Sequence, residues 1–162
     1  MKRIFIFGLI CFLALVSCST KEIDISKLKI YSINDLDLNK ISFDKEIFKN
    51  QLVIIHFWTT WSEESVEVLN QINDICKQSY DNISFFVINL DADREKVKEF
   101  LMSNNYLFNT YYDYQGLWTK NYYVRYVPYT LIYDKSGSLV KEYKASDYDD
   151  YEGFKDLIKA RK

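Results

Sequence analysis

Residues 52–65 read LVIIHFWTTWSEES and decide the fold of this chain. The first half is an almost unbroken apolar run of strand length, which is typical of a central strand covered on both faces. Ser62 is a good helix N-cap, and Glu63 and Glu64 place two carboxylates in the first turn, where they favour the helix dipole. The stretch therefore predicts a buried strand, a short aromatic loop and a helix, in that order.

Apolar periodicity predicts the remaining elements on both sides of this stretch. The helix is expected over residues 62–79. Further strands are expected at residues 28–33, 38–43, 83–90, 129–133 and 138–143, with turns at Asn34-Asp35 and at residues 134–137. Further helices are expected after residues 91–93, at 116–123 and at 149–160. This order predicts an α/β fold with a mixed central sheet flanked by helices.

The N-terminal segment has the features of a bacterial lipoprotein signal. Lys2 and Arg3 precede an apolar run over residues 4–16, which as a helix would be about 20 Å long and too short to cross a bilayer of about 30 Å. The run ends in Leu15-Val16-Ser17-Cys18, which looks like a lipobox. We expect a signal peptide at residues 1–17, a lipidated tether at 18–27 and one domain at 28–162. The alternative is an ordinary signal peptide followed by a chance cysteine.

Charge and cysteine content narrow the function classes. The chain of 162 residues has a net charge of −2, which argues against nucleic acid as a partner. Of its three cysteines, Cys11 leaves with the signal and Cys18 would carry lipid, so Cys76 remains as a single thiol. One thiol forms no internal disulfide, and no Cys/His spacing for zinc is present. We therefore expect neither a metal nor a cofactor.

The ordered motifs resemble the thioredoxin superfamily, and in particular its extracytoplasmic, membrane-anchored TlpA/ResA-like group. That group has Phe-Trp-x-x-Trp-Cys-x-x-Cys between strand and helix, and this chain has the matching aromatic residues from Phe57 to Trp61. Residues 30–50 resemble its N-terminal β-hairpin extension, and residues 126–130, Tyr-Val-Pro-Tyr-Thr, resemble its cis-proline loop. The resemblance implies a thioredoxin-like fold and, for the family, thiol-disulfide oxidoreductase activity.

The chain departs from the family at the two residues that carry its chemistry. Ser62 and Ser65 stand where the motif has its cysteines, and a hydroxyl cannot form a disulfide. The only histidine, His56, lies within the strand, where alternation puts it on the face of Ile54 and Trp58. It is interpreted as a core residue, so Ser62 has no evident base that would make it a nucleophile. We predict no catalytic residues.

The resemblance also implies a binding surface. In the family fold, the start of the active-site helix and the cis-proline loop form one shallow face. Here Trp61, Pro128 and Tyr129 are expected to line it, with Trp58 close behind. Exposed aromatic rings are common anchors for binding, and free backbone beside a cis proline suits an extended peptide.

These observations favour a lipid-anchored, non-catalytic module of the bacterial cell envelope that binds an envelope protein or extended peptide. Contact with the membrane would be through lipid on Cys18, and the residue after it is not aspartate, which favours the outer membrane. Two alternatives stay open. One is thiol-disulfide oxidoreductase activity by another route, and the other is a carbohydrate-binding or structural lipoprotein that uses the many aromatic side chains.

Overall fold

A mixed seven-stranded sheet forms the centre of the computed structural model, which describes residues 32–42, 47, 51–78, 82–145 and 153–160. Within these residues the strand order is β2-β1-β5-β4-β3-β6-β7. Strand β3 pairs in parallel with β4, and β4 with β5, whereas all other pairs are antiparallel. The predicted α/β fold with a mixed sheet is confirmed.

The described elements have the following bounds. The strands are β1 (Ser32–Asp35), β2 (Lys40–Ser42), β3 (Leu52–Trp58), β4 (Ile83–Asn89), β5 (Thr110–Tyr112), β6 (Tyr129–Tyr133) and β7 (Leu139–Lys144). The helices are α1 (Glu63–Cys76), α2 (Arg94–Asn104), α3 (Leu117–Asn121) and α4 (Phe154–Ala160). None of the helices in the described ranges is long and apolar enough to cross a membrane.

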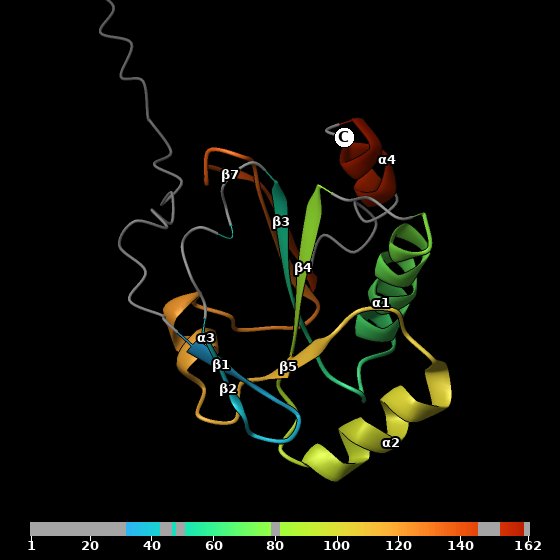
Figure 1. Ribbon diagram of the computed structural model, residues 1–162, viewed down its shortest axis with the longest axis vertical. Helices are drawn as coiled ribbons and strands as arrows, with labels where there is room; N and C mark the ends of the chain where they lie inside the picture. Colours follow the sequence, from blue (N-terminus) through green and yellow to red (C-terminus); the bar gives the residue numbers. More distant parts are fainter. Residues whose placement is uncertain (1–31, 43–46, 48–50, 79–81, 146–152, 161–162) are drawn as a thin grey trace, which may run out of the picture.

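Helices cover both faces of the sheet, and each face has its own core (Figure 1). Every residue of β3 is buried, and its side chains alternate between the two cores. Val53, Ile55 and Phe57 face the core that includes the aromatic rings of α3. Ile54 and Trp58 face the core formed with α1 and α4. Burial on both faces explains why β3 is a continuous apolar run.

The N-terminal hairpin is present, but its turn lies further along the chain than predicted. Asn34 and Asp35 belong to β1, and the turn spans residues 36–39. The Asp35 carboxylate accepts hydrogen bonds from the backbone N–H groups of Asp37 and Asn39, both at 2.8 Å. This side-chain bonding stabilises a turn after Asp35 rather than at it. The part of the predicted first strand before Ser32 lies outside the described residues.

One strand was not predicted from the sequence. Strand β5 has only three residues, Thr110–Tyr112, and pairs with both β1 and β4. The other predicted strands and helices are observed where the structure describes them, with shifted ends. The signal peptide, Cys18, the tether and the start of the predicted terminal helix lie outside the described residues.

Candidate binding site at the start of helix α1

Ser62 is used to cap helix α1. It has extended backbone angles, and its hydroxyl oxygen accepts a hydrogen bond from the Ser65 N–H at 3.1 Å. The same hydroxyl donates to the Glu64 carboxylate at 3.1 Å. Glu63 and Glu64 are exposed in the first turn, as predicted. Because both hydrogen-bonding roles of the hydroxyl serve the helix terminus, Ser62 has the geometry of a cap and not of an activated nucleophile.

Ser65 is fully buried beneath this turn. Its side-chain oxygen has no hydrogen-bond partner within the described protein. A buried hydroxyl without a partner costs stability, and one shielded from solvent cannot meet a substrate. Neither serine therefore offers chemistry of the kind that two cysteines would.

His56 is a core residue, as its position in β3 predicts. The ring is fully buried, and Nδ1 lies 2.8 Å from the Thr130 hydroxyl on the adjacent strand β6. Burial lowers the pKa of His56 to about 3. The imidazole is therefore neutral at physiological pH, and such a low pKa makes it a poor general base.

Asp91 holds the loop before α1, a role that sequence reasoning missed. One carboxylate oxygen accepts the Thr60 N–H at 2.8 Å and the Asn89 side-chain amide at 2.8 Å. The N-cap of the next helix, α2, is Asp93 and not Asp91. The available signal was its position directly after a core strand, where polar side chains of neighbouring loops meet.

Trp61 is the exposed residue of the loop between β3 and α1. Its side chain is 69% exposed, so the predicted surface aromatic residue is where it was expected. Trp58 is fully buried and packs against Phe100 at 5.6 Å between ring centroids. Its assignment to the binding surface is wrong, because strand alternation continues to the end of β3 and turns the indole into the core.

The cis-proline loop enters the sheet beside the Trp61 loop. The Val127–Pro128 peptide bond is cis, as predicted, but Pro128 is buried, so the prediction that this residue lines the exposed surface is wrong. The first residue of β6, Tyr129, pairs with Phe57 near the end of β3, so the two loops leave the same edge of neighbouring strands. Among the described residues, the backbone N–H groups of residues 125–127 have no hydrogen-bond acceptor.

Tyr129 does not belong to the exposed surface. It is 7% exposed, its ring lies 6.0 Å from that of Phe57, and its hydroxyl donates to Glu142. The exposed tyrosine beside the proline is Tyr126, at 76%. The prediction that Tyr129 lines the surface is wrong, because Tyr129 is already paired within β6 and its ring packs into the core, whereas Tyr126 precedes the strand.

Cys76 is the only cysteine among the described residues and is not near this site. It is the last residue of α1, about 20 Å along the helix from Ser62 at 1.5 Å per residue. It is partly buried, and this burial raises the pKa of its thiol. The described side chains also include no group of three or more His, Cys, Asp or Glu that could hold a metal ion.

Comparison with known proteins decides the family. A family model described as thioredoxin-like matches residues 50–139, which include β3, the loop, α1 and the cis-proline segment. The chain belongs to the thioredoxin-like family. The thiol-disulfide oxidoreductase ResA of Bacillus thuringiensis subsp. konkukian is 28% identical over 116 residues, which are 70% of this chain and 65% of that relative.

Solved structures show the same family fold. StoA of Bacillus subtilis has a TM-score of 0.60 at 22% identity, covering 70% of this chain and 86% of StoA. The exposed lipoprotein thioredoxin of Streptococcus pneumoniae has a TM-score of 0.61 at 19% identity, covering 78% of this chain and 98% of that protein. At these identities the likeness establishes the fold.

Proposed function

We propose that this chain is a thioredoxin-like module of the cell envelope that binds an extended protein segment and does not exchange disulfides. One observation carries the proposal. Exposed aromatic side chains, Trp61 and Tyr126, occupy two loops at one edge of the sheet, and the backbone N–H groups of residues 125–127 beside them have no acceptor in the described chain. Backbone pairing with aromatic burial is a common way to bind an extended peptide.

The absence of redox chemistry is supported by what occupies the start of α1. The resemblance places Ser62 and Ser65 at the family's cysteine positions, and the two serines cap the helix or lie buried. Relatives such as ResA are named thiol-disulfide oxidoreductases, so that activity is the alternative function. It would need two thiols that can reach each other, whereas Cys76 lies at the far end of α1 with a raised pKa. We expect no insulin reduction by the wild-type protein.

Crosslinking tests the binding surface directly. A photoreactive phenylalanine analogue replaces Trp61 or Tyr126, and the matched control replaces Met102, which is 80% exposed on α2. In envelope extracts we expect a common adduct from the first two positions and its absence from the third. Trp61→Ala should then weaken binding of the adduct protein by about tenfold or more, and Met102→Ala should leave it unchanged.

The aromatic surface also suits sugar stacking, which is why a glycan array accompanies the crosslinking. Glycan binding that depends on Trp61, without a protein adduct, would replace the peptide proposal by a carbohydrate-binding one. Equal crosslinking from all three positions would show that the surface around Trp61 and Tyr126 is not a specific binding site.

The location is proposed from the signal sequence. Residues 15–18 resemble a lipobox, and a structural neighbour from Streptococcus pneumoniae is an exposed lipoprotein. We propose that Cys18 is the lipidated N-terminus and anchors the domain to the outer membrane. Mass spectrometry of the envelope protein should find diacylglycerol on Cys18, and an unmodified Cys18 or another cleavage site would contradict this.

A further inference from the structure

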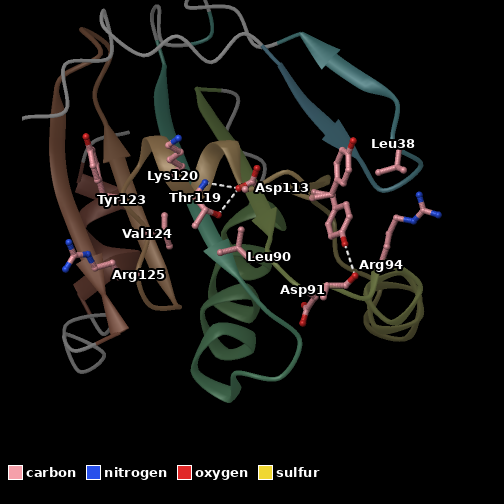
Figure 2. Close-up of a pocket in the computed structure, with 14 residues that line it drawn as sticks. Leu38, Leu90, Asp91, Arg94, Asp113, Thr119, Lys120, Tyr123, Val124 and Arg125 are labelled. Atoms are coloured by element: carbon pink, nitrogen blue, oxygen red, sulfur yellow. Dashed lines mark hydrogen bonds between the residues drawn. The ribbon is translucent and has the colours of Figure 1, made fainter.

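A groove of about 930 Å³ lies at the carboxyl ends of β4 and β5. Its walls come from the β1–β2 turn, the start of α2, and the segment from α3 to the cis-proline loop. Figure 2 shows Lys120, Tyr123 and Arg125 on one side and Leu38 and Arg94 on the other, with Leu90, Asp91 and Asp113 between them. The fold thus assembles one groove from three distant parts of the sequence.

Three cationic side chains line this groove, Arg94, Lys120 and Arg125, together with the carboxylates Asp91 and Asp113, so the lining has a net charge of +1 (3 − 2). Asp113 accepts hydrogen bonds from two N–H groups and a hydroxyl at the start of α3, at 2.7–3.1 Å. Asp91 is occupied by the loop before α1. Both carboxylates therefore have internal partners. Lys120 and Arg125 are exposed, and within the described residues neither forms an ion pair or a side-chain hydrogen bond.

Unfavourable backbone conformations are concentrated at this groove. Three described non-glycine residues have positive φ, and two of them, Leu38 at 64° and Tyr123 at 54°, line it. Tyr123 follows α3 at a position where Val124 N–H bonds the Thr119 carbonyl at 3.0 Å, and glycine is the usual residue there. Its side chain is 72% exposed, so burial does not explain the tyrosine. Such outliers cluster at ligand-binding sites.

The groove is continuous with the proposed peptide surface. Arg125 lines the groove and is also the first of the three residues whose backbone N–H groups have no acceptor. A chain paired with this segment would therefore pass beside the groove. Backbone N–H groups without an acceptor can bond the carbonyl groups of an extended peptide, as in the addition of a strand to a sheet edge. The site therefore favours a protein segment over an acidic glycan.

We propose that this groove binds acidic side chains of the extended segment, with Lys120 and Arg125 contacting aspartate or glutamate. This inference rests on the proposed function and adds that the bound segment is acidic. Charged groups at the rim of an interface select partners and steer their approach.

A synthetic array of random nonapeptides tests the charge preference. Peptides bound by the wild type should be enriched in aspartate and glutamate, and Gln-substituted copies of them should bind about threefold to tenfold more weakly. The double variant Lys120→Glu/Arg125→Glu should lose this preference. The control Lys135→Glu/Lys159→Glu has the same change in net charge on exposed lysines outside the groove and should keep it.

Salt provides a second measurement on the unaltered protein. The preference for acidic peptides should shrink as sodium chloride rises, because ions screen exposed charges. Binding that depends on Trp61 but ignores peptide charge would overturn this inference and leave the proposed function standing. An array with no bound peptide would overturn both. Labelled oligogalacturonate that binds more tightly than any peptide, in a manner dependent on Lys120, would assign the groove to acidic saccharides instead.

Discussion

The two serines at the start of α1 should respond in opposite directions to replacement by alanine. Ser62→Ala removes the N-cap that bonds the Ser65 N–H, which should lower the free energy of unfolding by about 1 kcal/mol. Ser65→Ala removes a fully buried hydroxyl that has no partner and adds a better helix former. It should raise the free energy of unfolding by about 1 kcal/mol.

The gap of about 2 kcal/mol between the variants corresponds to about 4–8 °C in melting temperature for a protein of this size. Urea titration followed by tryptophan fluorescence and far-UV circular dichroism measures it. Ser103→Ala is the control, because Ser103 lies on the exposed face of α2 and should change stability by less than about 0.5 kcal/mol. If Ser65→Ala destabilised the protein as much as Ser62→Ala, the Ser65 hydroxyl would have a bonding partner and the reasoning would fail.

Three further predictions concern His56, the missing thiols and Asp91. The only histidine is protonated near pH 6.5 in the unfolded chain but only near pH 3 in the folded protein. The free energy of unfolding should therefore fall as the pH drops from 6.5 to 5, with a slope approaching about 1.4 kcal/mol per pH unit. His56→Gln should abolish this slope. Ser62→Cys/Ser65→Cys should form an internal disulfide detectable by thiol titration, and failure to oxidise would show that the helix start no longer has the family's geometry. Asp91→Ala should lower the free energy of unfolding by about 1–3 kcal/mol and weaken partner binding. The control Asp93→Ala removes only the cap of α2 and should leave partner binding unchanged.

Short-range patterns predicted the part of the fold that carries the candidate site. The apolar run of β3, the Ser62 cap and the two glutamates are local features, so the strand and the start of α1 could be placed without a structure. Strand alternation also put His56 in the core, because successive side chains of a strand point to opposite faces. The same alternation puts Trp58 on the face of His56, so its indole belongs to the core and not to the binding surface.

The sequence by itself determined the family, the order of the elements and the lack of paired thiols. The tertiary structure decided which tyrosine beside Pro128 is exposed, because Tyr129 turns inward only once β6 pairs with β3. It also decided the three-residue strand β5, which forms because β1 and β4 supply partners on both sides. The groove was beyond sequence reasoning for the same reason. Its walls come from segments far apart along the chain, and their contact depends on the packing of the whole sheet rather than on any local pattern.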